Sequence, residues 1–341
     1  MHKKITFLIT VFLFFISCQR DILESKGEFN EIIIISSVED KEILEPIVNE
    51  YIFEGIVYNP EPEFVYSKKW INPSGFKYYK DYSNIIIISI SDPEDESIDN
   101  LLKIFENKHN ISEYPVTIKN IFAYPQTITL IKENNNVDLK YNLNYTADLI
   151  KSVINENIDS LYLFRYKKLI SKNISDSLNI ESLAKNLFDI ELLVDLDFKI
   201  IDSSYYENKF LWLGKGAIES DNSASYQWIF IKELENSLKI EGNLDFERVV
   251  KENLKAIHPD IDLISNFNNY SKLPHKNKNI YKINSVYNHN LYKTGGPLIA
   301  YLVEEKNKNK FTIFYGIVNA PGKSKIRYIK ELETIIINSI F

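Results

Sequence analysis

The chain contains one cysteine, Cys18, among its 341 residues. A single cysteine cannot form a disulfide within the chain, so the stability of the protein has to come from a hydrophobic core. Hydrophobic residues make up 45% and charged residues 26% of the sequence, which are ordinary values for a globular protein. We therefore expect a folded body of one large domain or two smaller ones, without a long disordered region.

The sequence also has no apolar run near its start that is long enough to span a bilayer, which takes roughly 20 residues. Residues 5–16 are almost wholly apolar, follow the positively charged residues 2–4, and end at Ser17 and Cys18. This order is typical of a secretory signal peptide, which we assign to residues 1–17. Residues 15–18 (FISC) resemble a bacterial lipobox, in which the cysteine is acylated and becomes the new N-terminus. The resemblance implies lipid attachment at Cys18; the alternative is a secreted protein with an incidental cysteine.

Several kinds of functional motif are missing. There is no HExxH and no GxSxG motif, and His109, His258, His275 and His289 follow no short metal-ligand spacing. An acylated Cys18 could not act as a nucleophile. The net charge of −7 argues mildly against nucleic acid and anionic lipid surfaces as partners. We expect no cofactor, no metal and no nucleotide, while paired carboxylates, whose spacing is set only by the fold, leave a hydrolase possible.

The first half of the chain contains two runs of isoleucine, at residues 31–37 (EIIIISS) and 84–90 (NIIIISI). Such short continuous apolar runs suit strands that are buried on both faces of a sheet. We expect these two strands near the centre of one sheet, paired in parallel and covered by helices. Residues 18–30 are polar and fit a lipidated tether. The folded body then divides into an N-terminal α/β part at 31–140, a helical connector at 141–190 and a C-terminal α/β part at 191–341.

Two further predictions concern the connector and the segment that follows it. The helical pattern over residues 145–170 makes five residues candidate buried positions: Leu149, Val153, Leu161, Phe164 and Leu169. Residues 256–290 are rich in Asn, Lys and Tyr, and we expect a long surface excursion there.

The end of the chain has the clearest pattern. Residues 297–304 and 310–318 are rich in β-branched and aromatic residues and predict a β-hairpin. The helix expected after it carries an apolar stripe wide enough to cover a sheet, formed by Ile326, Ile329, Leu332, Ile336 and Ile340. The predicted fold class is therefore α+β or mixed α/β, with mixed sheets covered by helices and a C-terminal hairpin followed by a helix.

Two groups of residues are candidates for binding. Gly322, Lys323 and Ser324 follow a strand and open a helix, as in a phosphate-binding loop, but Ile317 stands where that motif needs its first glycine. A turn and helix start is the simpler interpretation; the alternative is an anion held at the helix N-terminus by Lys323 and Lys325. Tryptophans in or near strands, such as Trp212, suit either a recognition surface or the core.

Five segments together resemble an uncharacterised family of bacterial envelope lipoproteins, defined only as a domain of unknown function (DUF4837). They are residues 27–32 (GEFNEI), 210–213 (FLWL), 294–297 (TGGP), 315–323 (YGIVNAPGK) and 328–333 (YIKELE). The resemblance covers nearly the whole mature chain and implies a lipoprotein without an assigned activity. The candidate interaction or anion site consists of Trp212, Gly295, Gly296, Lys323, Lys325 and Arg327.

These observations predict a cell-envelope protein on the extracytoplasmic side, anchored by lipid in the outer membrane. Its expected role is binding or scaffolding without catalysis, with another envelope protein as a possible partner. The alternative is a hydrolase that acts on an envelope polymer. Neither nucleic acid nor nucleotide is expected as a partner.

Overall fold

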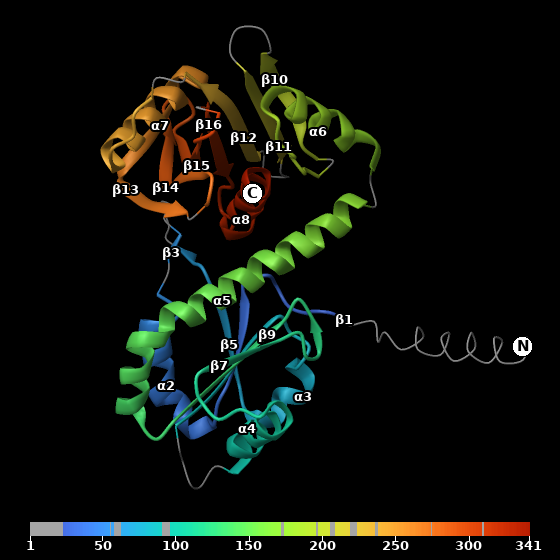
Figure 1. Ribbon diagram of the computed structural model, residues 1–341, viewed down its shortest axis with the longest axis vertical. Helices are drawn as coiled ribbons and strands as arrows, with labels where there is room; N and C mark the ends of the chain where they lie inside the picture. Colours follow the sequence, from blue (N-terminus) through green and yellow to red (C-terminus); the bar gives the residue numbers. More distant parts are fainter. Residues whose placement is uncertain are drawn as a thin grey trace, which may run out of the picture. The chain divides into compact units, whose positions relative to one another are not determined.

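The computed structural model describes residues 23–54, 56–57, 63–90, 96–171, 174–195, 197–204, 209–218, 224–235, 238–273, 275–308 and 310–341. The chain divides into two compact units (Figure 1). The N-terminal unit comprises the residues up to Phe53 together with Ser67–Leu161, and the C-terminal unit comprises Glu54–Tyr66 and Tyr162–Phe341. The predicted signal peptide at 1–17 and Cys18 lie outside the described residues. Among the described helices, none is long and apolar enough to cross a membrane.

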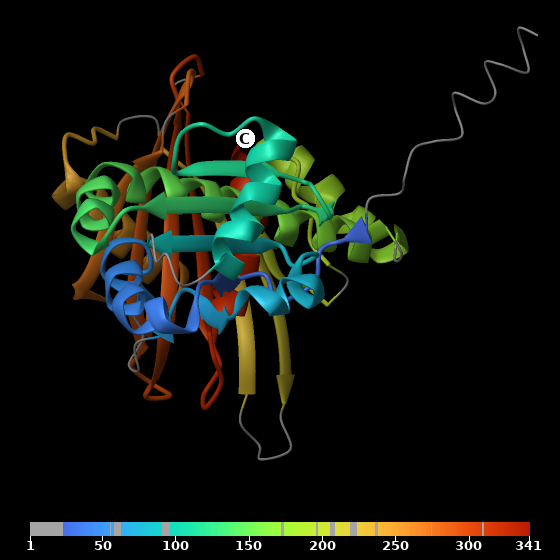
Figure 2. The ribbon, with the colours of Figure 1, turned by 90° about the horizontal axis from the view of Figure 1, so that it is seen from below.

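The N-terminal unit contains a five-stranded sheet in the order β5-β2-β6-β9-β7, whose strands run side by side in Figure 2. Its strands are β2 (Glu31–Ile35), β5 (Ser67–Ile71), β6 (Asn84–Ile90), β7 (Val116–Lys119) and β9 (Thr127–Glu133). The two isoleucine runs are β2 and β6, and they pair in parallel as predicted, because each is buried on both faces. Only β7 runs antiparallel to its neighbour.

Helices cover this sheet: α2 (Val38–Tyr51), α3 (Phe76–Tyr79), α4 (Glu96–His109) and the first part of the long α5 (Asn136–Ser171), with a short 3-10 helix at Pro73–Gly75. From Tyr162 on, α5 belongs to the C-terminal unit. Leu101, Leu102 and Phe105 of α4 pack against Ile33 and Ile85. Because side chains alternate along a strand, the intervening isoleucines point to the opposite face.

A short parallel pair, β1 (Leu23–Glu24) with β8 (Ala123–Tyr124), also belongs to the N-terminal unit. The first described strand therefore begins at Leu23, inside the segment 18–30 that the sequence suggests as a tether.

The prediction that Leu149 is buried is wrong, because its side chain is 65% exposed. The buried face of α5 instead runs through Leu143, Ala147, Ile150 and Ile154. Leu161 is buried, as predicted, while Val153 and Phe164 are only half-buried and the side chain of Leu169 lies outside the described residues. The sequence of α5 has apolar residues on more than one side, so periodicity alone did not identify the side that faces the core.

The C-terminal unit is built on a seven-stranded antiparallel sheet in the order β10-β11-β12-β16-β15-β14-β13. Its strands are β10 (Lys199–Ser204), β11 (Phe210–Ile218), β12 (Ala224–Leu234), β13 (Ile261–Leu273), β14 (Lys278–His289), β15 (Thr294–Glu305) and β16 (Lys310–Asn319). The predicted hairpin is confirmed, since β15 and β16 pair from Leu298 opposite Ile317 to Glu305 opposite Lys310. A small pair, β3 (Ile56–Val57) with β4 (Glu63–Phe64), also belongs to this unit.

The prediction of a surface excursion at residues 256–290 is wrong, because this segment contains β13 and β14. β13 is the last strand of the sheet, and most of its side chains are exposed or half-buried. An edge strand tolerates polar residues such as Asn268 and Lys272, and these residues concealed the strand pattern.

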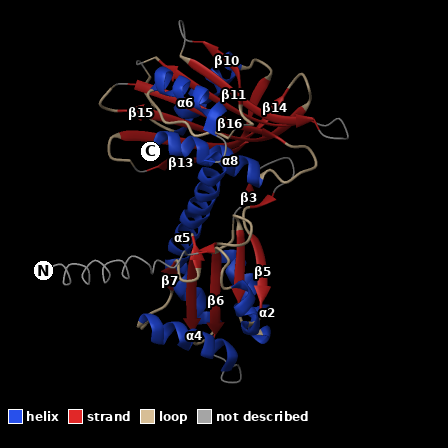
Figure 3. Cartoon of the chain, turned by 90° about the vertical axis from the view of Figure 1, so that its right-hand side faces the viewer, coloured by secondary structure: helices blue, strands red, loops and turns tan. Residues whose placement is uncertain are grey.

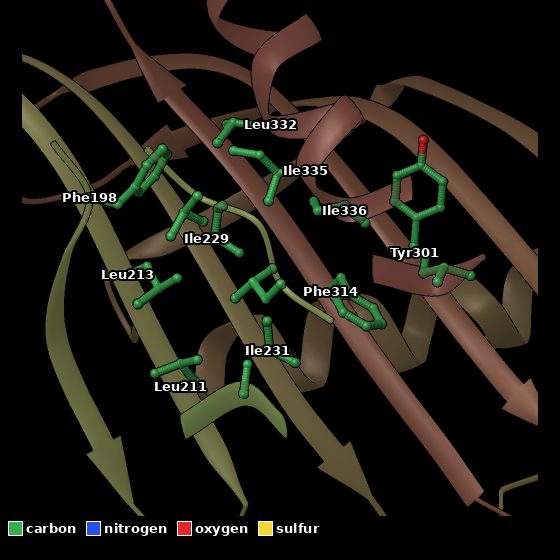
Figure 4. Packing of buried hydrophobic residues seen from close by; sticks show 14 of the residues in the cluster. Phe198, Leu211, Leu213, Ile229, Ile231, Tyr301, Phe314, Leu332, Ile335 and Ile336 are labelled. Atoms are coloured by element: carbon green, nitrogen blue, oxygen red, sulfur yellow. The ribbon is translucent and has the colours of Figure 1, made fainter. Parts of the chain in front are cut away.

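The two faces of this sheet are covered by different helices. The predicted C-terminal helix is α8 (Ile326–Ile340), and with α6 (Ile174–Phe188) it covers one face (Figure 3). Figure 4 shows Leu332, Ile335 and Ile336 of α8 over side chains such as Ile229 and Phe314. The opposite face packs against α7 (Asn243–Ile257). The predicted fold class, α+β with mixed sheets covered by helices, is confirmed.

Candidate functional site

A group of aromatic rings lies on the face of the C-terminal sheet that α7 covers. Side chains alternate along a strand, so Trp212 on β11 and Trp228 on β12 point to this face, opposite to Leu213 and Ile229. The aromatic–histidine cluster consists of Trp212, Tyr226, Trp228, His258, His289 and Tyr292. His258 follows the end of α7, and His289 ends β14.

The rings of the cluster contact one another in a continuous series. Trp228 lies between Tyr226, with ring centroids 4.2 Å apart, and His258, with centroids 5.6 Å apart. Trp212 meets both Trp228 and His258 edge-on, at 5.2 and 5.8 Å. His258 and His289 are 5.1 Å apart, and His289 lies 4.7 Å from Tyr292. Both faces of Trp228 are covered, so this ring is a packing element and no stacking platform for a ligand.

Three polar atoms of this cluster are buried and have no hydrogen-bond partner among the described residues: Nε1 of Trp212, Nδ1 of His258 and Nε2 of His289. The backbone N–H of Tyr292 donates to Nδ1 of His289 over 3.4 Å, which leaves Nε2 to carry the ring proton. Burial lowers the pKa of His258, and the neighbouring His289 lowers it further. A buried polar atom without a partner costs free energy, so each of these atoms would gain from a partner group.

The rim of the cluster is exposed to solvent. Tyr292 is 69% and Leu291 is 64% exposed, and both lie in the turn between β14 and β15. Large exposed aromatic and aliphatic side chains beside a half-buried aromatic group are typical of protein recognition surfaces.

Gly295 and Gly296 lie at the same end of the sheet, in the first residues of β15. Gly296 pairs with Tyr287, whose hydroxyl lies 3.2 Å from the hydroxyl of Tyr226 in the cluster. A Cβ atom on Gly296 would lie 2.1 Å from the carbonyl oxygen of Val318, so only glycine allows this close approach. The structure thus brings Trp212 and the two glycines into one neighbourhood, where the glycines serve strand packing.

The other face of the sheet contains a buried group of charges that the sequence analysis did not identify. Nζ of Lys215 lies 2.6 Å from Oδ2 of Asp195 and 2.9 Å from Oε1 of Glu331, and Gln227 donates to Oε2 of Glu331 over 2.9 Å. The carboxylate side chains of Asp195 and Glu331 are only 7% and 8% exposed. The sequence does contain an indication of this buried charge, because Lys215 follows Leu211 and Leu213 on the apolar side of β11.

The pKa values of this group reflect its burial. Burial raises the pKa of Glu331, and the attraction of Lys215 only partly opposes this effect. Burial alone would lower the pKa of Lys215, but its two carboxylate neighbours raise it. Glu331 therefore takes up a proton more readily than a solvent-exposed glutamate does.

Lys323, Lys325 and Arg327 lie at the start of α8, where the sequence suggested an anion site. The carboxylate of Glu63, on β4, is already there: the backbone N–H of Lys325 donates to its two oxygens over 3.0 and 3.1 Å, and the Ser324 hydroxyl donates over 2.6 Å. Nζ of Lys325 lies 3.7 Å from Glu63, while Lys323 and Arg327 are exposed. An anion from solution would have to displace Glu63. In the described part of the chain, no group of three potential metal ligands comes together.

Residues 177–338 match the model of a family described as a domain of unknown function (DUF4837), in agreement with the resemblance to this domain over that part of the chain. The match is narrower than predicted: it contains the four later segments of the resemblance but not residues 27–32. No curated protein and no solved structure matches the chain.

Proposed function

We propose that this chain, of which residues 177–338 match the DUF4837 family model, is a lipoprotein of the cell envelope that binds another envelope protein. Cys18 is its lipid attachment site, and the body lies on the extracytoplasmic side of the outer membrane. Its role is binding or scaffolding and involves no catalysis.

The anchor is supported by the start of the sequence. The only cysteine of the chain follows directly on a short apolar segment with a positively charged start, where a cleaved signal would end. The described structure begins five positions later, at Leu23, so folded chain follows close behind this cysteine.

The binding role is supported by the aromatic–histidine cluster and its exposed rim. Tyr292 and Leu291 offer apolar contact area, and the three buried nitrogen atoms beneath them have no partner within the described chain. Aromatic side chains supply much contact area at little cost in conformational entropy, and they are enriched where proteins recognise one another. Binding that rearranged the rim would give these nitrogen atoms partners.

Site-specific photo-crosslinking in cells tests the binding role. A photoreactive amino acid replaces Tyr292, and in a matched control it replaces Leu244, which is 83% exposed on α7 of the same unit. We expect a discrete covalent adduct with one envelope protein from position 292 and none from position 244. A pull-down of the same protein from detergent-solubilised envelope, weakened by Trp212→Ala, would support the assignment. Equal adducts from both positions, or none from position 292, would refute it.

The second candidate function is hydrolysis of an envelope polymer. The main observation in its favour is the buried group of charges on the other face of the C-terminal sheet. Asp195 and Glu331 approach the same Lys215, and Glu331 has a raised pKa, as the general acid of a hydrolase does. Release of dye from labelled peptidoglycan would support this function if Glu331→Gln abolished it. Under the binding proposal, neither the parent chain nor the variant releases dye.

A further inference from the structure

The long helix α5 carries apolar residues on two opposite sides within the N-terminal unit. One side is buried, and it includes Leu139 and Leu143. The other side carries large hydrophobic residues at every fourth position, each between 65% and 73% exposed: Val137, Tyr141, Tyr145 and Leu149. Positions 137 and 139 are two residues apart, about 200° around a helix, so the two stripes face away from each other. The four exposed residues are called the α5 stripe below.

The α5 stripe is a continuous patch. The rings of Tyr141 and Tyr145 contact each other edge-on, with centroids 5.2 Å apart. Twelve residues separate its ends, so it extends about 18 Å along the helix. A tyrosine side chain has about 200 Å² of surface, and valine and leucine have somewhat less. With about two thirds of each side chain exposed, the stripe presents roughly 450 Å² of mostly apolar surface. The largest apolar patch on a typical monomer has about this size and is often functional.

The size of the patch favours a lipid surface over a second copy of the chain. A stable protein interface buries about 800 Å² on each partner, which the stripe does not reach. A lipid surface needs no such area when a separate anchor already holds the protein beside it. Tyrosine is also enriched at the level of the lipid headgroups, because its ring is apolar and its hydroxyl polar.

The charges beside the stripe fit an uncharged lipid surface. Residues 136–151 contain two acidic side chains, Asp138 and Asp148, and two basic ones, Lys140 and Lys151, so their charges cancel. This segment therefore neither repels a bilayer nor depends on anionic lipids to approach it.

The position of the anchor points in the same direction. β1 begins at Leu23, five residues after Cys18, and five residues span at most about 18 Å. β1 is fixed within the N-terminal unit by its pairing with β8, and the backbone N–H of Ser25 donates to the carbonyl of Tyr124 over 3.0 Å. An acyl chain on Cys18 would therefore hold the N-terminal unit, which contains the α5 stripe, close to the membrane surface, with little freedom to move away.

We propose that the α5 stripe lies against the headgroups of the bilayer that holds Cys18, and so sets the orientation of the N-terminal unit on the membrane. This inference rests on the lipid anchor of the proposed function. It assigns Val137, Tyr141, Tyr145 and Leu149 a role in lipid contact.

Single-cysteine labelling tests the contact directly. Acylation uses the thiol of Cys18, the only cysteine, so Tyr145→Cys introduces the only free thiol in the lipidated chain. The matched control is Ile104→Cys, on α4 of the same unit, where the native side chain is 62% exposed. Each variant carries a polarity-sensitive nitrobenzoxadiazole label, and the full lipidated chain is reconstituted into vesicles of phosphatidylcholine and phosphatidylethanolamine.

We expect the label at position 145 to shift its emission to shorter wavelength, to brighten several-fold on vesicles, and to be quenched by lipids spin-labelled at the headgroup. The label at position 104 should have the same emission on vesicles as in solution. Identical emission of the label at position 145 on vesicles and in solution would overturn the inference.

A chain held at the membrane by a different tether tests the lipid contact of the α5 stripe independently of the lipid anchor at Cys18. Lipidation is measured independently, from the mass of the N-terminal peptide and from flotation of the chain with vesicles. If Cys18 proves unmodified, a chain with a histidine tag in place of residues 1–18 is held on vesicles that contain a nickel-chelating lipid. The label at position 145 then reports on the stripe: emission shifted as above supports the lipid contact, and unshifted emission refutes it although the chain is held at the membrane.

Discussion

Replacing Lys215 by methionine leaves two buried carboxylates without their cation. Lys215 contacts Asp195 at 2.6 Å and Glu331 at 2.9 Å, and both carboxylate side chains are more than nine-tenths buried. Removing one partner of a buried ion pair costs about 3–5 kcal/mol, because the charge left behind is no longer compensated. The Lys215 side chain is 23% exposed, so solvent screens part of the interaction, and we expect a loss of about 3 kcal/mol. For a unit of this size, that lowers Tm by about 6–12 °C.

Urea unfolding at pH 7 measures this loss, in a chain that starts at Gln19. Trp212 and Trp228 lie in the C-terminal unit, so a Trp70→Phe background lets tryptophan fluorescence report that unit alone. The matched control is Lys209→Met, which removes a lysine that pairs with Glu233 while 45% exposed; a surface pair of this kind contributes at most about 1 kcal/mol.

The effect of pH provides a second check on Lys215→Met. Without the lysine, the pKa of Glu331 in the folded state rises further above its unfolded value. A raised pKa means that the folded state takes up protons first, so the stability deficit should shrink from pH 8 to pH 5. Equal stability of Lys215→Met and Lys209→Met at pH 7 would refute the argument from burial.

Three further changes have definite expected outcomes. Gly296→Ala places a Cβ 2.1 Å from the carbonyl oxygen of Val318, so we expect a loss of about 3 kcal/mol or failure to fold, measured by circular dichroism and thermal unfolding. Burial raises the pKa of Glu247, but hydrogen bonds from neighbours such as Lys251 outweigh it and lower the pKa from 4.5 to about 2. The stability that Glu247 contributes should be complete above about pH 4.5 and lost as the pH falls towards 2, and Glu247→Gln should remove this part of the acid dependence of urea unfolding. Glu63→Gln should cost about 1 kcal/mol, because the start of α8 loses its carboxylate; no change in urea unfolding would count against that contact.

The sequence was sufficient to predict those helices and strands that are marked by a local residue pattern. The four consecutive isoleucines of β2 and of β6 predicted buried parallel strands, and the stripe from Ile326 to Ile340 predicted α8. In these segments the residues that form the element also face the core, so periodicity and burial agree. The long edge strand β13 was missed because its exposed positions carry polar residues, and Leu149 was misplaced because α5 is apolar on two sides.

The candidate site was harder to predict because its members come from distant segments. Trp212, His258 and His289 meet only when β11, β14 and the end of α7 are brought together by the sheet. The same holds for Lys215 and Glu331, which are separated by 116 positions along the chain. Glu63 at the start of α8 comes from a small hairpin outside the family match, and no local pattern could have indicated that an internal carboxylate occupies the predicted anion site.

Metabolic labelling with palmitate, followed by mass spectrometry of the N-terminal peptide, tests the lipid anchor most directly. We expect the chain to incorporate the label, to begin at an acylated Cys18 and to fractionate with the outer membrane, whereas Cys18→Ser remains unlabelled. An unlabelled, soluble chain that retains residues 1–17 would contradict the proposed anchor at Cys18.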